Sequence, residues 1–574
     1  MSGGPIEDDR TLVERVADRP GPALPWLGAG LVLLALEFGR FLGWALSLGA
    51  GLRFAFDGIV AIPGWVGGNV ADTAGSLAGF LAQDLTALVV LFVVASVLVR
   101  LAPWRIVDRL ELGWSRKREA YAERLAVTAV LAAVASALAF TPAGSILRFE
   151  LEVAAWLLES VAASIPTLTS PETIPNQGHR TPGGGWEGTF LGLSPAVAWA
   201  IRTAVVFAYA LACLVWAWSG YDRYRRHYRQ ADWTPRDDTV RRLRNHYWGL
   251  FGLTIVIGFV VLALWAPAIS PVPAEANIYQ PYEHEFEYLG EDGEVASITH
   301  GAANINTRSD GQHTVAPLSY DQYDRFAPLG TTPRGQDLLT NLAFGARTSL
   351  IIGLTAIGLG AFIAVVLSLL TAYYKGVADV LTVVASDTII SIPAFLLVML
   401  ISVIFSEGNH PLADPLDGGL LLALVFAFVF WPGMWRAIRG PSLQVAEQEW
   451  VDAAKSYGQR PTTTMRKHMS PYIAGYIMIY ASLLLGSVII FTAALTFLGL
   501  GISPPTPEWG RLIDQGQPYI ATSSWHVATI SGLMIVLVVT AFNALGDALR
   551  DAIDPEADVG EGEETGGATT GGGV

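Results

Sequence analysis

The stretch Glu449-Trp-Val-Asp-Ala-Ala-Lys-Ser-Tyr-Gly458, continuing to Pro471, is a short polar, amphipathic insert between two strongly apolar segments. Four of its residues recur at i, i+3, i+4 and i+7 and would share one face of a helix: Trp450, Ala453, Ala454 and Tyr457. Asp452 lies off that face, Gly458 is typical of a helix end, and Pro461 is typical of the start of another helix. The pattern predicts helix, turn and helix along a membrane surface. It fits equally a docking site for another protein and a loop that rests on lipid headgroups.

The composition of the chain is that of a protein that crosses a membrane several times. Of its 574 residues, 52% are hydrophobic and 15% are charged, whereas soluble proteins carry about 25% charged residues. The single cysteine, Cys213, excludes a disulfide within the chain, and the net charge of −15 argues against a nucleic-acid partner. Many acidic residues with little lysine are typical of a halophilic, high-salt cytoplasm or, alternatively, of a high-GC genome.

Apolar segments of about 20 residues, the length that a helix needs to cross the hydrocarbon core, recur along the whole chain. They lie at 25–49, 80–101, 124–141, 196–218, 247–270, 347–373, 383–406, 419–438, 473–498 and 526–548. The sequence therefore predicts an all-α polytopic membrane protein with about ten transmembrane helices. The apolar stretch 146–166 is interrupted by charges and is expected to lie in the membrane interface. Arg202 is expected to extend its charge outward from its span.

Basic residues set the expected orientation, because cytoplasmic loops carry an excess of arginine and lysine. They gather at 105–118, 223–244 and in the insert 440–472. With both termini in the cytoplasm, all three clusters lie on the inner side of the cell membrane. The loops that are poor in basic residues then lie outside: 50–79, 142–195, 271–346, 407–418 and 499–525.

The motif Asp452-Ala-Ala, with Gly458 after three residues and Pro471 thirteen residues later, resembles the EAA motif of ABC-importer permeases. Asp452 stands where that family usually has glutamate, and His468 and Ser470 stand near Pro471 where aliphatic residues are more usual. Flanking motifs resemble the C-type subunit of dipeptide/oligopeptide (and nickel) permeases. They are Leu329-Gly-Thr-Thr-Pro-Arg-Gly-Gln-Asp337, Thr496-Phe-Leu-Gly-Leu-Gly501 and the stretches 345–350, 373–376, 391–393, 504–510 and 543–555.

This resemblance implies a type I ABC-importer permease core of six spans at 244–556. It also implies partners in the lipid bilayer and on both sides of it: a homologous B-type permease subunit, two ATPase subunits and an extracellular solute-binding protein. In that family the EAA motif is the coupling helix, which docks in a cleft of the ATPase. The residues expected to form this coupling site are Trp450, Asp452, Ala453, Ala454, Tyr457, Gly458 and Pro471.

The resemblance does not cover the first four spans, at 23–243, which form an N-terminal extension whose role stays open. One hypothesis is an interaction or lipid-facing scaffold module that holds the complex together. Residues 1–22 are expected to be a cytoplasmic N-terminal segment. The segment 271–346 is expected to be a small external cap with some strand, and the tail 557–574 is acidic, rich in glycine and expected to be disordered.

No sequence of the form G-x-x-x-x-G-K-[ST], which cradles nucleotide phosphates, occurs in the chain. ATP and magnesium are therefore expected in the partner ATPase subunits, with no cofactor and no catalytic residue in this chain. The histidines of the cap, His284, His300 and His313, are expected to be solvated rather than to bind a metal.

Polar residues and a proline within the spans complete the candidate sites. Those expected to line the translocation path or to pack the helices around it are Asp387, Pro393, Asn543 and Asp547. Pro393 is expected to kink its span. Glu37 and Arg40 can neutralise each other at i, i+3; in the alternative hypothesis of a gradient-driven transporter or channel, they form an ion path with Asp387. The substrate stays open among peptides, nickel chelates and oligosaccharides.

Overall fold

The described residues fold mainly into helices, which confirms the all-α membrane class. The computed structural model describes residues 11–101, 116–140, 150–162 except 151, 152, 154 and 159, 164–229, 234–407 and 410–553. The N-terminal residues 1–10 and the expected disordered tail lie outside the described residues. The chain divides into two compact units. The first unit comprises residues up to 36, 168–403 and those from 416 onward, and the second comprises 37–167 and 404–415.

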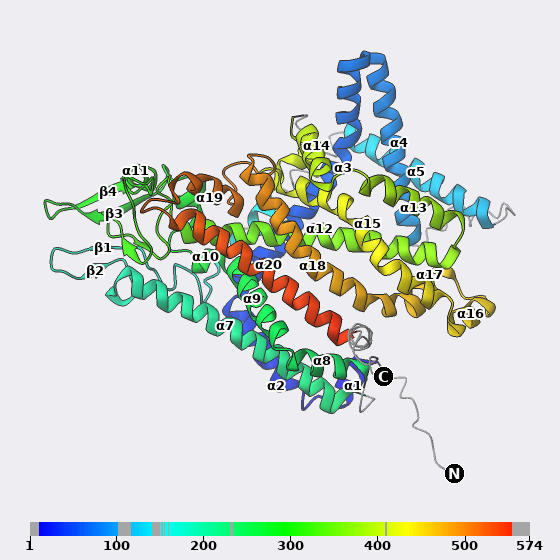
Figure 1. Ribbon diagram of the computed structural model, residues 1–574, viewed down its shortest axis with the longest axis horizontal. Coiled ribbons are helices and arrows are strands. Elements are labelled where there is room, and N and C mark those ends of the chain that lie inside the picture. The colour runs from blue at the N-terminus through cyan, green and yellow to red at the C-terminus, as the bar shows by residue number, and fades with distance from the viewer. Residues whose placement is uncertain are drawn as a thin grey trace, which may run out of the picture. The chain divides into compact units, whose positions relative to one another are not determined.

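Long helices packed side by side form the centre of the first unit. They are α9 (Tyr247–Leu264), α12 (Leu338–Tyr374), α15 (Gly419–Ala446), α18 (Ser470–Phe497) and α20 (His526–Ile553). Helix α12 packs along α15, and α18 packs along α20 (Figure 1). Phe259, Leu342, Trp509 and Phe542 meet in a buried apolar cluster between these helices, so the first unit has a continuous core.

The helices that are able to cross a membrane agree with nine of the ten expected spans. Within the described residues, seven helices are long and apolar enough, and two broken pairs raise the number to nine. One pair is α13 (Val377–Ile390) and α14 (Ala394–Glu407), which are bent by 84° at the break. The other is α2 (Leu24–Leu36) with the start of α3 (Phe38–Ala74). The tenth expected span, 124–141, lies in α5 (Arg116–Phe140), which is helical but is not among these candidates.

The second unit is built from α3, α4 (Ser76–Leu101) and α5. The segment 50–79, expected as an external connection between two spans, is helical: α3 continues without interruption to Ala74 and α4 begins at Ser76. Gly75 makes the turn with a φ of 90°, which a residue with a side chain adopts only at a cost. This stretch is less apolar than its neighbours, so its composition did not indicate a continuous helix. A helix pairs its backbone N–H and C=O groups internally whether its side chains are apolar or polar.

Within the second unit, aromatic rings join α3 to the segment 404–415. Trp65 stacks on Phe405 with the ring centroids 4.9 Å apart, and the His410 ring meets Trp65 edge-on at 5.2 Å. His410 is fully buried. This segment connects α14 to α15, so the second unit includes a connection of the core helices.

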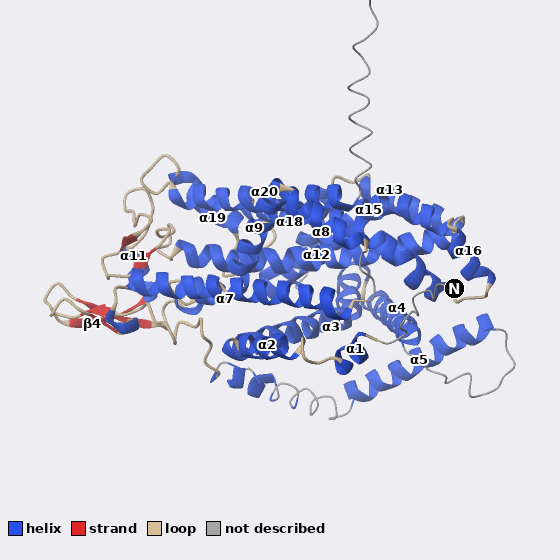
Figure 2. Ribbon diagram, turned by 90° about the horizontal axis from the view of Figure 1, so that it is seen from below, coloured by secondary structure: helices blue, strands red, loops and turns tan. Residues whose placement is uncertain are grey.

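Three short hairpins lie at one end of the helices of the first unit (Figure 2). The expected cap, 271–346, ends earlier than predicted, because α12 begins at Leu338. The segment 271–337, here called the cap, contains β3 (Glu285–Leu289) paired with β4 (Val295–Thr299), and β5 (Ser319–Tyr320) paired with β6 (Phe326–Ala327). The hairpin of β1 (His179–Arg180) and β2 (Trp186–Glu187) lies beside β3. The Nδ1 atom of His179 is 3.4 Å from Oε2 of Glu287. The cap therefore packs against a hairpin from the extension.

Arg202 joins the extension to the first helix of the core. It lies on α7 (Pro195–Arg223), and the expectation that it extends outward is wrong, because its side chain is fully buried. Its guanidinium donates to the carbonyl oxygens of Ala268 (2.7 Å), Ser270 (2.7 Å) and Ile174 (3.1 Å). Trp199 donates to Ile269 at 2.7 Å. The carbonyls of Ala268, Ile269 and Ser270 lie in the last turn and at the C-cap of α10 (Ala266–Ile269), the short helix that follows α9. A helix end leaves its acceptors without partners, so α7 caps α10.

A second joint within the extension pairs α2 with α7. The rings of Trp26 and Trp216 stack with centroids 4.6 Å apart, and each indole N–H donates to the backbone carbonyl of the other tryptophan at 2.9 Å. The glycines four residues later leave space for the rings. A Cβ atom would lie 2.7 Å from Trp216 at Gly30 and 2.6 Å from Trp26 at Gly220. The two tryptophan–glycine pairs therefore form a reciprocal clasp.

A buried carboxylate holds the loop that precedes α20. Glu508 caps α19 (Trp509–Gly516) and accepts from the backbone N–H groups of Gly510 (2.5 Å) and Arg511 (3.2 Å). Burial raises the pKa of Glu508 to about 7, although these hydrogen bonds act in the opposite direction. The carboxyl group is therefore partly protonated at neutral pH.

We expect Arg202→Met to lower the thermal stability of the purified protein strongly. The variant leaves three carbonyl groups without their donor, and each unpaired buried polar group costs about 1–3 kcal/mol. The matched control is Arg180→Met, because Arg180 is 51% exposed and pairs with Asp324 at 3.3 Å, and exposed pairs contribute about 0–1 kcal/mol. Equal shifts in melting temperature for the two variants would contradict the capping role.

We expect the stability of the protein to fall as the pH rises through about 7, and Glu508→Gln to reduce this dependence. The pKa of Glu508 is raised in the fold, so its contribution is fully present below the ordinary glutamate pKa and is lost as the carboxyl ionises. The effect is on the order of 2 kcal/mol. Melting temperatures measured from pH 5 to 8 check it, and parallel curves for the two proteins would refute it.

Candidate functional site

The polar insert folds as helix, turn and helix, as its pattern predicts. Helix α16 (Glu449–Ser456) is followed by a turn in which Gly458 has a φ of 73°. Helix α17 (Pro461–Thr464) then continues through a π-helical turn, η7 (Met465–Met469), into α18. The insert lies at the opposite end of the first unit from the strand hairpins (Figure 1).

Val451 anchors α16 to the core. Its side chain is fully buried in a cluster with Ala372 of α12, Ala446 of α15, and Met465 and Met469 of η7. Each of these neighbours lies at or near the end of a core helix. Because close-packed side chains transmit displacement rather than absorb it, a push on α16 reaches α12, α15 and α18 together.

Two further contacts restrain the ends of α16. The Trp450 ring stacks on Tyr472 of α18 with the centroids 5.6 Å apart. Lys455 lies 5.2 Å from the centroid of the Tyr373 ring and pairs with Asp452 at 3.2 Å. Cation–π contacts of this kind contribute about 0.5–1 kcal/mol at exposed sites. The helix is therefore held at three places along its length.

Burial of Val451 fixes how α16 is rotated about its axis, and this rotation decides which of its residues are available to a partner. Those that face solvent are Glu449, Trp450, Asp452, Ala453, Ser456, Tyr457, Gly458 and Pro471. Tyr457 is 92% exposed and Trp450 is 41% exposed. Ala454, expected on the same face as Ala453, is half-buried, whereas Asp452, expected off that face, is exposed. Helical spacing alone did not identify Val451 as the anchor, although it is a β-branched apolar residue in a polar stretch.

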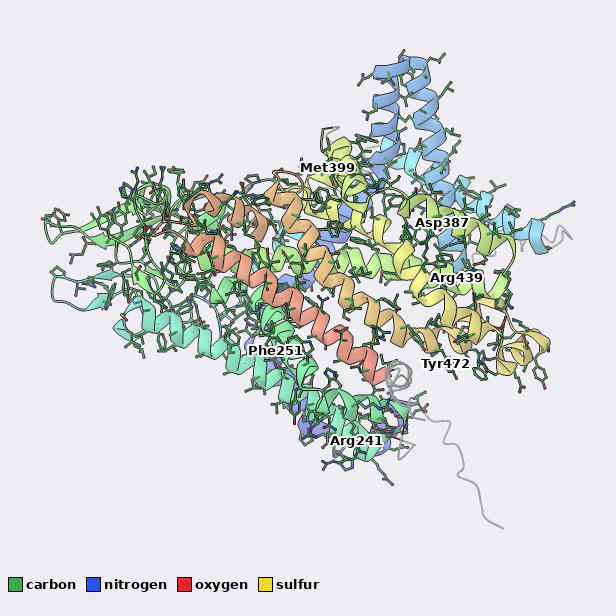
Figure 3. The ribbon with its side chains drawn as sticks, in the orientation of Figure 1. Arg241, Phe251, Asp387, Met399, Arg439 and Tyr472 are labelled. Carbon is green, nitrogen blue, oxygen red and sulfur yellow. The ribbon has the colours of Figure 1, made fainter. Side chains whose placement is uncertain are left out.

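Asp387 forms an ion pair that holds α13 against α15. Its carboxylate accepts from Arg436, whose Nε also donates to Ser386 at 3.2 Å. A second pair, Asp379 with Arg439, joins the same helices at 2.5 and 2.9 Å. Asp387 and Arg439 are labelled in Figure 3. Sequence reasoning singled out Asp387 but missed its partner Arg436 and the whole second pair, for which the only signal was acids and bases on neighbouring spans.

Pro393 lies at the break between α13 and α14, where the kink predicted from the sequence is a bend of 84°. Proline removes a backbone donor and cannot continue the hydrogen bonding of the preceding helix. A cavity of about 660 Å³ lies between the cap and the segment 176–195 of the extension, and a second one of about 430 Å³ lies beside this break. The second cavity is lined by Pro393 and Ile392 at the break, by Phe430 of α15 and by Tyr480 of α18.

Asn543 and Asp547 lie on the exposed face of α20, one turn apart. Leu533 and Val536 continue this face and are 63% and 61% exposed. The polar residues are therefore not gathered with Asp387 into a single site. Beyond them, Asp551 pairs with His246 at 3.2 Å.

The cap histidines differ in their surroundings. His284 and His313 are exposed, but His300 is buried and within hydrogen-bonding distance, 3.3 Å, of Arg325. Burial lowers the pKa of His300 to about 3, with Arg325 acting in the same direction. The ring is therefore neutral at physiological pH. Within the part of the chain that the structure describes, no group of three or more histidine, cysteine or acidic residues is arranged to hold a metal ion.

Comparison with known families identifies the core. The family model described as "Binding-protein-dependent transport system inner membrane component" matches residues 356–559. The model for the "N-terminal TM domain of oligopeptide transport permease C" matches residues 234–285. Together these matches include α9, the second half of α12 and everything from there to α20, with the insert, and they leave the first four expected spans unmatched.

Similar curated proteins include the glutathione transport system permease protein GsiD of Shigella dysenteriae serotype 1, which is 30% identical over 323 residues. The match covers 56% of this chain and 91% of that protein. GsiD of Escherichia coli O1:K1 is 29% identical over the same length. This similarity spans nearly all of the relative, and the packed helices with a docked polar insert agree with it. The chain therefore belongs to the permease family of binding-protein-dependent ABC importers, as a multi-pass membrane subunit.

Proposed function

We propose that α16 is the surface on which a separate ATPase subunit acts, and that this chain forms one half of the path for a peptide-like solute. The observation that carries the proposal is an exposed helix face, centred on Ala453 and Tyr457, on a helix whose opposite side is anchored by Val451. The small Ala453 side chain lets a partner approach closely, and the exposed Tyr457 ring offers contact area. The insert then lies in the cytoplasm, as do both termini.

Movement of α16 has a continuous route to the centre of the subunit. The Val451 cluster joins it to the ends of α12 and α15. The pairs of Asp387 with Arg436 and Asp379 with Arg439 then join α15 to α13. The break at Pro393 and its apolar cavity follow along the chain. In this proposal the broken helix changes its angle as the path opens alternately to the two sides of the membrane.

The remaining surfaces suit the partners that this family requires. The exposed face of α20, with Asn543 and Asp547, needs cover from protein or water, because a lipid-facing carboxylate is costly. We assign it to the homologous B-type permease or to the path between the two permease subunits. Two ATPase subunits then supply ATP and magnesium, the solute-binding protein docks at the cap, and this chain contributes no catalytic residue and no cofactor site.

Peptide-like solutes are the proposed substrates, because the similar proteins are named as glutathione permeases. Nickel chelates and oligosaccharides remain the alternatives, and affinity measurements on the associated solute-binding protein distinguish them. A gradient-driven transporter is less well supported. Its ion path requires available charges, whereas Glu37 pairs with Arg40 at 2.7 Å and Asp387 pairs with Arg436.

The extension at 23–243 is proposed to hold the complex together. The capping of α10 by Arg202 and Trp199 supports this role, since it joins α7 to the first helix of the core. The hairpin that the extension packs against the cap also supports a contribution to docking of the solute-binding protein.

We expect Ala453→Arg to abolish stimulation of ATP hydrolysis by the loaded solute-binding protein while the complex still inserts into membranes. The long charged side chain would occupy the face on which the ATPase docks, and Ala453 has room for it because it is exposed. Ala454 is half-buried, so a change there would also disturb packing. The matched control is Val13→Arg, at a position ahead of the first candidate span that is 78% exposed and that belongs to no proposed docking surface. Unchanged stimulation in Ala453→Arg would defeat the assignment of the coupling site.

We expect Asp387→Arg to impair transport and the exchanged pair Asp387→Arg with Arg436→Asp to restore most of it. A packing role depends on the attraction between α13 and α15, which the exchange preserves. An ion path instead depends on a carboxylate at position 387. Solute uptake into proteoliposomes, with ATP or with an imposed proton gradient, separates the two. Gradient-driven uptake that is lost in Asp387→Asn would favour the alternative function.

A further inference from the structure

A basic helix directly precedes the first core span. Helix α8 (Pro235–Asn245) carries Arg241 and Arg244, which are exposed and lie one turn apart. Neither forms a hydrogen bond or an ion pair with any residue that the structure describes. Figure 3 labels Arg241, which lies on α8, and Phe251, which lies on the following helix, α9. The chain as a whole has a net charge of −15, so two neighbouring arginines without acidic partners form a basic site in an otherwise acidic protein.

Two other arginines nearby are already neutralised by acids. Arg229 donates to both carboxylate oxygens of Asp237, at 2.5 and 3.0 Å, and this interaction holds the pKa of Asp237 well below its usual range. Arg226 pairs with Asp222 at 2.9 Å. The acids of this region are therefore occupied, and the charges of Arg241 and Arg244 remain for a ligand outside the chain.

The position of α8 is fixed relative to the membrane-crossing helices. Arg242 donates to the carbonyl oxygen of Ala552 at the end of α20 at 3.5 Å, and His246 pairs with Asp551 at 3.2 Å. The candidate span of α9 begins at Tyr247, three residues after Arg244. At about 1.5 Å per residue, the arginines lie within the depth of the headgroup layer at the start of that span.

Exposed aromatic rings lie directly after the two arginines, at the start of the candidate span. Tyr247 is 88% exposed and Trp248 is 50% exposed. The ring of Trp248 stacks on Phe251 with the centroids 5.1 Å apart. Exposed tyrosine and tryptophan at the end of a span are typical of the boundary between headgroups and hydrocarbon. Basic residues followed along the chain by aromatic residues match the order of a phospholipid, with its phosphate outside and its chains inside.

We propose that Arg241 and Arg244 form a binding site for the phosphate of an anionic phospholipid, with the Tyr247, Trp248 and Phe251 rings against its acyl chains. The two guanidinium groups provide charge-assisted hydrogen bonds to phosphate oxygens. The rings give the site an apolar part that free inorganic phosphate cannot use. The bound lipid would hold α8 against α20. It would thereby fix the N-terminal end of α9, whereas the contacts of Arg202 with α10 lie beyond its C-terminal end.

The test is photo-crosslinking of the full transport complex in nanodiscs that contain a photoactivatable phosphatidylglycerol or phosphatidylcholine. Mass spectrometry then measures the labelling of residues 234–251. We expect preferential labelling by phosphatidylglycerol in the wild type, and a loss on the order of tenfold in Arg241→Gln with Arg244→Gln, given the attraction of each basic residue to an anionic surface. Excess inorganic phosphate should leave the labelling unchanged.

The control variant is Arg225→Gln with Arg226→Gln, which removes the same charge from a neighbouring exposed stretch and should retain the labelling. If the double glutamine variant at 241 and 244 fails to assemble, the two lysine substitutions keep the charge and should keep the preference. Equal labelling by both lipids, or displacement by phosphate, would overturn the proposal. Unchanged labelling with loss of the ATPase from the complex would also overturn it and indicate a protein partner.

Discussion

The proposed mechanism depends on the contacts that bury the Val451 side chain. It places a short helix, exposed on its other side, against the ends of three core helices. A loop resting on lipid headgroups would have no need of such an anchor. Because the cluster is close-packed and includes residues from α12, α15 and η7, displacement of α16 cannot be absorbed locally. Coupling in this account is thus a consequence of packing, and the exposed residues of α16 determine only which partner delivers the push.

The Arg202 joint gives the extension a structural role. Helix ends leave carbonyl groups without partners, and here the acceptors at the C-terminal end of α10 receive donors from α7. The relatives are matched over nearly their whole length by 323 residues of this chain, and the joint lies between that shared core and the added helices. The tryptophan clasp then connects α2 to the same helix. The core and the extension therefore share hydrogen bonds that removal of the extension would leave unsatisfied.

Local sequence was sufficient for the features that depend on composition and spacing. Long apolar runs predicted nine segments that the structure presents as candidate spans, Pro393 predicted the kink, and Gly458 predicted the end of α16. Features that depend on distant residues could not be predicted in this way. Nothing near Arg202 in the sequence indicates the carbonyls at 268 and 270, and the half-buried position of Ala454 follows from the packing of Val451. The helical continuation of α3 through 50–74 was likewise hidden by its mixed composition.

The most direct measurement of the central claim is cross-linking from a single cysteine on α16. Replacing Cys213, the only cysteine of the chain, by serine gives a background in which Ala453→Cys supplies one reactive thiol on the exposed face. A short bifunctional thiol reagent and a cysteine-bearing ATPase subunit then report their proximity. The account predicts an efficient cross-link from position 453 whose yield changes with ATP, and none from Val295→Cys in the cap. Absence of a cross-link from position 453 in an assembled, active complex would contradict it.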